Sequence, residues 1–496
     1  MTNISGAALT PPAPMPTRVP GLDAVLRGGF PRGGAYLIGG PPGTGKTTLG
    51  NQIAFAHAAA GESAVFASIL SEPHDRMLAN LAGFDFFDES LVGGPLQFVN
   101  IFDSLSGGDL MEGLTVLRDM IRRQRATLAV LDGTSALEQM DLTAIDLSRF
   151  VYDLHAQGAL LGCTVLLLAL TRPGAPRPIE TYVDGLISLE DQSVGQRDLR
   201  YLRVPKLRGV DQLRGRHSYT ISGGGLRVFP RIESANTLGY SPESREALYP
   251  FGIEGLDNML RGGVHSGSST LVLGTPGAGK TMLGLHFIAA GQAGGERGLI
   301  ASLRESPEEL RAKASSVGLS LNGPVEILWH RPTELAPDAW AESVLEAVAR
   351  NRSTRVMIDS AAELDYLLEP TPGRLRAFFT ALLDALSSAG ATVVVTGELR
   401  TLVGEVGLPL LATMADNALL LRSVELRSQL HRIVSVIKAG HAAHDTALRE
   451  FRIDVGGVQV ADTFETAEAV LTGVARMNPA SGRVAPGPSG VGETSQ

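Results

Sequence analysis

Two glycine-rich loops in this sequence each end in a lysine followed by a threonine. They read Gly40-Pro41-Pro42-Gly43-Thr44-Gly45-Lys46-Thr47-Thr48 and Gly274-Thr275-Pro276-Gly277-Ala278-Gly279-Lys280-Thr281-Met282. Both contain Gly-x-x-x-x-Gly-Lys-Thr, the pattern of a phosphate-binding loop between a strand and a helix. Backbone N–H groups of such a loop point at phosphate oxygens, the lysine reaches the β- and γ-phosphates, and the threonine hydroxyl binds Mg²⁺. The loops therefore predict two nucleotide sites. The alternative, a degenerate loop that has lost its ligand, is disfavoured because every required residue is present in both.

A metal-binding acid is expected at the end of a later strand in each half. Asp132 closes the apolar run 128–131, and Asp359 closes the run 355–358. A carboxylate at the end of a short buried strand is costly unless it faces a cation or a donor. We expect Thr47 with Asp132, and Thr281 with Asp359, to hold the metal ion. The alternative role for each aspartate is to cap the helix or turn that follows.

The chain contains one pattern twice. Gly21-Leu22-Asp23 is followed by Leu26-Arg27-Gly28-Gly29, and Gly255-Leu256-Asp257 is followed by Leu260-Arg261-Gly262-Gly263. Gly255 follows Gly21 by 234 residues, and Lys280 follows Lys46 by the same 234. A repeat of this length indicates two whole domains rather than a solenoid.

The elements that must position these loops also recur in both halves. The apolar runs are continuous rather than alternating, which is typical of parallel strands covered on both faces. Helical patterns follow each loop, at about 46–60 and 280–290, and lie between the strands. The sequence therefore predicts an α/β fold in which each half has a mostly parallel sheet with helices on both faces. The expected strands are 36–38, 64–67, 128–131 and 164–168, with counterparts at 270–273, 298–301, 355–358 and 392–395.

Composition excludes several classes of protein. Hydrophobic residues make up 44% of the 496 residues and charged residues 19%, so large cores can form. The net charge is −9, whereas a general nucleic-acid binder is expected to have an excess of basic residues. A single cysteine, Cys163, excludes an intrachain disulfide and a multi-cysteine zinc module. The N-terminus has no signal-peptide pattern and no apolar run is long enough to cross a bilayer, so we expect a soluble cytoplasmic protein without a membrane partner.

We expect the following organisation along the chain: a proline-rich disordered tail at 1–16, a first nucleotide-binding domain at 17–232, a linker at 233–249, a second nucleotide-binding domain at 250–470, and a disordered tail at 471–496 rich in Gly, Pro and Ser.

The sequence resembles the KaiC family of tandem RecA-type ATPases over about residues 17–470. Besides the two loops, the resemblance rests on the segments 200–209, which carries Lys-x-Arg-Gly, and 219–230, with comparable stretches at 424–438 and 449–453. It implies two tandem RecA-like P-loop NTPase domains that bind ATP and Mg²⁺. It also implies a homohexamer of two stacked rings with ATP between neighbouring subunits, and regulatory protein partners.

The chain departs from this family at the paired glutamates that follow the second strand, one of which activates the attacking water. In the first half the pair falls on Leu70 and Ser71, and only Glu72, displaced by one position, could substitute. In the second half Glu305 remains and Arg304 replaces the other glutamate. A general base contributes about 10²–10⁴-fold in rate. We therefore expect the first domain to hold ATP without hydrolysing it quickly. The alternative for Glu305 is a carboxylate at a helix start.

In the KaiC family, a lysine and an arginine act across the subunit boundary. This pair is complete in the first half of the chain and incomplete in the second, the reverse of the glutamate pair. Lys206 and Arg208 match the family pair that resembles an arginine finger, whereas in the second half Lys438 remains and Gly440 stands in place of the arginine. An arginine finger raises the rate of phosphoryl transfer by about 10³–10⁵-fold. The alternative for Lys206 and Arg208 is a solvated strand face.

These observations lead us to expect a slow, Mg²⁺-dependent ATPase whose nucleotide state controls ring assembly and partner binding, in signalling or timing. A serine/threonine autokinase is one alternative, although the family's acceptor pair reads Ala412 and Thr413 here. A DNA-dependent ATPase of the RecA/RadA type is a second, disfavoured by the acidic composition. A third is a non-catalytic ring in which ATP only stabilises the interface.

Overall fold

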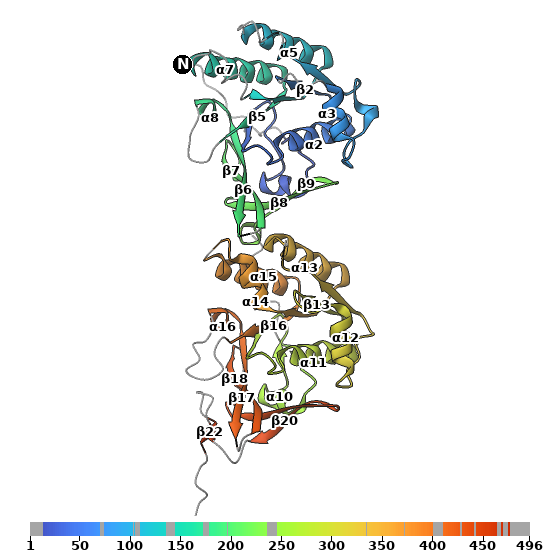
Figure 1. The fold of residues 1–496 in the computed structure, drawn as a ribbon, viewed down its shortest axis with the longest axis vertical. Helices are drawn as coiled ribbons and strands as arrows, with labels where there is room; N and C mark the ends of the chain where they lie inside the picture. Colours follow the sequence, from blue (N-terminus) through green and yellow to red (C-terminus); the bar gives the residue numbers. More distant parts are fainter. Residues whose placement is uncertain are drawn as a thin grey trace, which may run out of the picture. The chain divides into compact units, whose positions relative to one another are not determined.

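The computed structural model describes residues 13–69, 74–102, 104, 110–134, 144–171, 178–195, 197–235, 246–333, 335–371, 373–399, 410–426, 429–440, 443–463, 468–469 and 475–476. Glu72 and most of the two expected tails, 1–12 and 477–496, lie outside these residues. The chain divides into two compact units: 1–237 with 334–342, and 238–333 with 343–496. Figure 1 shows the elements of each unit coloured along the sequence.

The first unit is built on a nine-stranded sheet with the order β3-β2-β4-β5-β1-β6-β7-β8-β9. Neighbouring strands from β3 to β6 pair in parallel, and β6 to β9 continue the sheet as antiparallel neighbours. The strands are β1 (Ala35–Gly40), β2 (Ala64–Ser68), β3 (Leu96–Asn100), β4 (Leu128–Asp132), β5 (Thr164–Leu170), β6 (Gly185–Val194), β7 (Arg197–Leu207), β8 (Arg216–Ser222) and β9 (Gly225–Phe229).

The central strands of this sheet are covered on both faces by helices. Every residue of β1, β2 and β4 is buried, as a continuous apolar run requires. Side chains of α2 pack on one face, and those of α5 and α7 pack on the other. The helices are α1 (Leu22–Val25), α2 (Lys46–Ala59), α3 (His74–Leu81), the 3₁₀ helix η1 (Glu89–Leu91), α5 (Leu110–Gln124), α7 (Ala144–Leu161), α8 (Pro178–Tyr182) and α9 (Ile232–Ala235).

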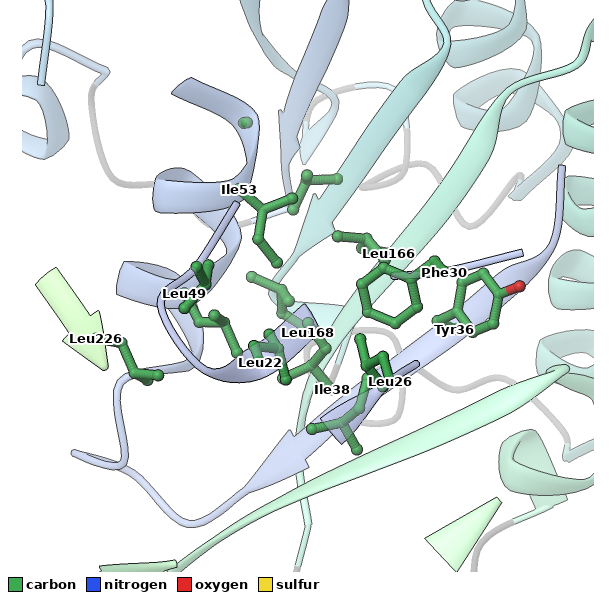
Figure 2. Close-up of a cluster of buried hydrophobic side chains, with 14 of the residues drawn as sticks. Leu22, Leu26, Phe30, Tyr36, Ile38, Leu49, Ile53, Leu166, Leu168 and Leu226 are labelled. Carbon is green, nitrogen blue, oxygen red and sulfur yellow. The ribbon is translucent and has the colours of Figure 1, made fainter. Parts of the chain in front are cut away.

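The hydrophobic core between α2 and the sheet holds the first phosphate loop in place. Figure 2 shows Leu49 and Ile53 of α2 beside Ile38 of β1 and Leu168 of β5. All four side chains are at most 1% exposed. Because β1 enters the loop and α2 leaves it, this packing holds both ends of the loop.

The second unit repeats the same topology. Its nine-stranded sheet has the order β14-β13-β15-β16-β12-β17-β18-β19-β20, again with an antiparallel extension from β17. The strands are β10 (Leu248–Tyr249), β11 (Val264–His265), β12 (Ser269–Gly274), β13 (Gly298–Ser302), β14 (Val325–Trp329), β15 (Arg355–Asp359), β16 (Thr392–Glu398), β17 (Asn417–Leu426), β18 (Gln429–Ala439), β19 (Arg449–Asp454), β20 (Gly457–Thr463), β21 (Glu468–Ala469) and β22 (Ala475–Arg476). The helices are α10 (Glu254–Met259), α11 (Lys280–Ala293), α12 (Pro307–Ser315), α13 (Pro337–Asn351), α14 (Ala361–Leu368), α15 (Arg374–Ser388) and α16 (Leu410–Met414).

The predicted fold class, two α/β domains with mostly parallel sheets, is confirmed. The four strands expected in each half all form, and each extends by at least one residue beyond the predicted run. The antiparallel half of each sheet is larger than the apolar runs indicated. Within the expected N-terminal tail, Met15 is fully buried and exchanges backbone hydrogen bonds with Phe30, so residues next to 17 already belong to the fold.

Candidate functional site: two nucleotide-binding loops

Each phosphate loop connects the end of a central strand to the start of a long helix. β1 ends at Gly40 and α2 begins at Lys46, while β12 ends at Gly274 and α11 begins at Lys280. The glycine before each lysine has a positive φ, +88° at Gly45 and +105° at Gly279. A Cβ at Gly45 would lie 2.4 Å from Ile221 Cδ1. The backbone conformation therefore requires glycine, and the side chain of Ile221 from β8 fills the space beside it.

The loop lysines have the same hydrogen bonds in both units. Lys46 Nζ donates to the carbonyls of Gly40 (2.9 Å) and Pro41 (2.7 Å). Lys280 Nζ donates to those of Gly274 and Thr275, each at 3.0 Å. Burial lowers the pKa of both lysines, although nearby Asp132 and Glu398 respectively oppose that shift. An ammonium has three donors, so one remains to be directed at a phosphate over the loop.

The threonine after each lysine is joined to the aspartate at the end of a neighbouring strand. Thr47 Oγ1 donates to Asp132 Oδ2 at 2.8 Å, and Thr281 Oγ1 donates to Asp359 Oδ2 at 3.0 Å. In the second unit Thr396 Oγ1 also donates to Asp359 Oδ1. Asp359 is only 4% exposed, and this burial raises its pKa.

A hydroxyl next to a buried carboxylate fits the ligand preference of Mg²⁺, which binds one or two protein oxygens and otherwise water and phosphate. Among the described residues, no group of three or more His, Cys, Asp or Glu is arranged to hold a metal ion by itself. The protein's share of each metal site would thus be one threonine and one aspartate.

The second loop opens into a cavity of about 330 Å³. Charged side chains of both signs line it, and they come from α11, the turn after β13, α12, β15 and β16. The lining residues are Pro276, Gly277, Gly279, Lys280, Thr281, Met282, Arg304, Glu305, Lys313, Asp359, Ser360, Glu398 and Ile453.

Glu305 lies in this cavity and is held by Lys313. Its Oε1 is 2.6 Å from Lys313 Nζ, while Oε2 is buried and has no hydrogen-bond partner among the described residues. The negative charge of Glu305 also contributes to the raised pKa of Asp359. A carboxylate oxygen with an unused lone pair beside the metal-binding acid can accept a proton from a water molecule.

Arg304 and Glu398 form an ion pair at the same cavity, with 3.0 Å between Nη1 and Oε1. The sequence analysis did not identify either as a site residue. Glu398 ends the strand β16 just as Asp359 ends β15, so the same strand-end signal could have found it. Arg304 was noted only as the residue that replaces one of the paired glutamates of the KaiC family.

The sequence analysis also missed Tyr219 of β8. Its hydroxyl donates to the carbonyl of Thr44 in the first loop at 2.7 Å. In the second unit Phe451 occupies the matching place and packs against Gly279. No local pattern identifies this contact, because the two residues are 175 positions apart.

The structure does not bring Lys206, Arg208 or Lys438 to the phosphate loop of their own unit. Lys206 on β7 pairs with Leu186 of β6, which pairs with Leu37 of β1, three residues before Gly40. Its ammonium donates to the carbonyls of Glu180 (3.1 Å) and Thr181 (3.4 Å).

Arg208 lies 3.5 Å from Asp184 and is 61% exposed. Lys438 donates to the carbonyls of Ala415 (2.6 Å) and Thr413 (3.5 Å). Glu72 lies outside the described residues. The remaining loop residues, including Pro42, Gly43, Thr48 and Ala278, lie in the loop or in the first turn of the helix after it.

No described helix combines the length and the hydropathy that a membrane span requires.

Comparison with known proteins gives one consistent result. The family model described as "ATPase: KaiC" matches twice, at residues 15–233 and 249–465. Similar curated proteins are each described as "Circadian clock oscillator protein KaiC". Those of a Picosynechococcus species and of Thermosynechococcus vestitus are each 26% identical to this chain, with 92% of this chain and 91% of the relative covered. That of Synechococcus elongatus is 26% identical, covering 93% and 91%.

Proposed function

The chain belongs to the KaiC family of ATPases, and on this premise we propose that it binds Mg-ATP at both loops and hydrolyses it slowly. The observation that carries the proposal is the repeated geometry of a loop lysine, a threonine and a strand-end aspartate. Loop N–H groups and the lysine would hold the phosphates, and the threonine with the aspartate would hold Mg²⁺. The bound metal ion would neutralise charge on the phosphate oxygens.

The two domains are proposed to contribute differently. In the second, Glu305 would orient the attacking water and accept its proton through the unpartnered Oε2. In the first, Leu70 and Ser71 stand where the glutamates would be, and Glu72 is the nearest carboxylate in sequence. We therefore assign most of the turnover to the second domain and mainly nucleotide retention to the first.

We further propose that the protein assembles as a homohexamer with ATP at the subunit boundaries. The side chains of Lys206, Arg208 and Lys438 contact segments other than the phosphate loop of their own unit, which supports a role toward the loop of a neighbouring subunit. The side chain of Arg208 in particular is exposed, and its ion pair with Asp184 is long, at 3.5 Å. Nucleotide occupancy would then control ring assembly and, through it, the binding of regulatory proteins.

Two variants test this proposal domain by domain. Lys46→Ala and Lys280→Ala each remove one phosphate-binding ammonium, with light scattering reporting assembly and phosphate release reporting turnover. We expect Lys280→Ala to remove most of the turnover and Lys46→Ala to impair ATP-dependent assembly. Fast hydrolysis comparable with motor ATPases would contradict slow turnover. Failure of the wild-type protein to retain any adenine nucleotide in equilibrium dialysis with Mg²⁺ would overturn the proposal.

A further inference from the structure

Arg304, a residue of the cavity at the second loop, has no cationic counterpart at the matching sequence position of the first domain. Arg304 lines the same cavity as Lys280 and Thr281. Leu70 is the residue 234 positions earlier, so the first domain has a leucine at the matching place. The situation is reversed directly after β7 and its counterpart β18, where the first domain has Arg208 and the second has Gly440. At these two pairs of matched positions each domain therefore has a single arginine, but not at the same position.

The position of Gly440 does not readily accept a larger residue. A Cβ built on Gly440 would lie 2.9 Å from the backbone oxygen of Asp416. Because this contact is with backbone rather than with a flexible side chain, an arginine could stand there only if the strand end shifted. The second domain thus lacks both the residue and the space for an arginine at this point.

The backbone of Arg304 is held next to the proposed metal site. Arg304 follows β13, whose last residue, Ser302, is in register with Asp359 of β15. The turn is fixed because Ser302 Oγ donates to the carbonyl of Glu305 (2.7 Å) and accepts from its N–H (3.0 Å). Leu303, 1% exposed, anchors the same turn and donates from its N–H to the carbonyl of Asp359 (2.8 Å).

The side chain of Arg304, by contrast, is free to change partner. It is 60% exposed, and its partner Glu398 is 32% exposed. An exposed ion pair of this kind contributes little to stability. A phosphate offers the guanidinium two parallel charge-assisted hydrogen bonds, which are stronger.

We propose that Arg304 is the γ-phosphate-binding arginine of the second domain, supplied by the same subunit, and that it leaves Glu398 when ATP is bound. This inference rests on the proposed function, because it requires ATP at the second loop. In the hydrolytic step a water oxygen bonds to the γ-phosphorus as the bond from that phosphorus to the β–γ bridging oxygen breaks. ADP leaves with the bonding electron pair, and the water's proton passes to Glu305. Arg304 would stabilise the charge on the γ-phosphoryl oxygens.

The test uses the full-length Lys46→Ala protein as parent, so that the second loop is the one measured. Arg304→Gln should weaken ATP binding about tenfold or more, as expected for a lost charged hydrogen bond, and leave ADP binding unchanged. Single-turnover phosphate release should fall by about 10³-fold or more. Arg304→Lys keeps the charge without the planar fork and should recover part of both losses. Arg311→Gln, an exposed arginine on α12 that does not line the cavity, is the matched control.

A second variant tests the exchange of partners. Glu398→Gln removes the carboxylate that Arg304 must leave, so ATP affinity should rise while ADP affinity stays the same. If Arg304→Gln releases phosphate at the rate of its Lys46→Ala parent, or if it loses ATP and ADP binding equally, the assignment of Arg304 is overturned. Unchanged ATP affinity in Glu398→Gln would overturn the exchange. Failure of the parent itself to bind either nucleotide would instead overturn the proposed function.

Discussion

The hydroxyl of Thr281 donates a 3.0 Å hydrogen bond to Oδ2 of Asp359. Thr396 donates to the other oxygen of the same carboxylate. These two hydrogen bonds favour the ionised form, but burial raises the pKa of Asp359 above the ordinary value of 3.8 and outweighs them. The ionised form of this buried carboxylate is therefore disfavoured in the folded protein until a cation binds beside it.

Asp359→Asn should change the pH dependence of stability in a definite direction. Protonation of Asp359 contributes stability that is fully present below pH 3.8 and is lost as the pH rises through the raised pKa of the folded state. Asparagine does not titrate, so the variant lacks this pH-dependent contribution. The wild-type Tm minus the variant Tm, measured without nucleotide by calorimetry, should therefore increase as the pH is lowered from 7.5 toward 5. A difference that decreases over this range would contradict the assigned direction.

The same variant tests the metal site. A ligand at 100 times its Kd stabilises the folded state by about 2.7 kcal/mol. Mg-ATP should raise the Tm of the Lys46→Ala protein but have much less effect when Asp359→Asn is added. If both proteins gain equally from Mg-ATP, Asp359 does not hold the metal ion. ATP in EDTA serves as the control, since the metal-free nucleotide should distinguish the two proteins far less.

The parts of the fold and site that sequence predicts best are those governed by neighbours along the chain. The loop 274–281 requires a glycine with positive φ at a fixed distance from its lysine, so the pattern itself specifies the conformation. Asp359 could be placed at its site because parallel strands end at the same edge of the sheet.

Contacts between distant segments were not predictable in this way. Tyr219 reaches Thr44 across 175 positions, and Arg304 reaches Glu398 across 94. The length and number of the antiparallel strands β6 to β9 were also not predicted, because half-exposed strands have no continuous apolar run to identify them.

Glu305→Gln should separate catalysis from binding in the second domain. In the Lys46→Ala protein, loss of the proposed general base should lower single-turnover phosphate release by about 10²–10⁴-fold. The Kd for ATP should change little, because glutamine keeps the size of the side chain. Glu308→Gln, which alters an exposed acid in the first turn of α12, three residues after Glu305, should leave both quantities unchanged. A Glu305→Gln rate equal to that of its parent would show that another group receives the proton.

Tyr219→Phe should destabilise the first domain. The hydroxyl of Tyr219 is buried and donates to the carbonyl of Thr44 at 2.7 Å, so its removal leaves that carbonyl without this partner. Such a loss costs about 1–3 kcal/mol. We expect a lower Tm and weaker ATP retention by the Lys280→Ala protein, whose first loop is intact. Tyr152→Phe, which alters a tyrosine that is 62% exposed, is the control. Equal melting of the two variants would argue against a supporting role for the hydroxyl.

Thr413 is the residue to examine for self-phosphorylation. It is exposed on α16, whereas Ala412 beside it is 4% exposed and has no hydroxyl. If the protein transfers phosphate to itself, mass spectrometry after incubation with Mg-ATP should find the modification on Thr413, and Lys280→Ala should abolish it. An unmodified peptide at full coverage would remove the autokinase alternative and leave water as the acceptor.

Mixing of two inactive proteins tests whether Arg208 acts on a neighbouring subunit. Both proteins carry Lys280→Ala, so that only first-domain turnover is measured. One also carries Arg208→Ala and the other Lys46→Ala. In a mixed ring roughly a quarter of the interfaces would combine an intact loop from the first protein with an intact Arg208 from the second. Release of γ-labelled phosphate by the mixture should therefore exceed that of either protein alone.

The control for this experiment replaces Arg208→Ala by Arg203→Ala, which alters an exposed arginine on the same strand, β7. That protein should hydrolyse ATP at the rate of Lys280→Ala alone and gain nothing from mixing. Because the side chain of Arg208 is 61% exposed and its ion pair with Asp184 is long, its loss should leave the Tm nearly unchanged, so a low rate would not reflect unfolding. If the mixture releases phosphate only at the average rate of its two components, Arg208 does not act across the subunit boundary.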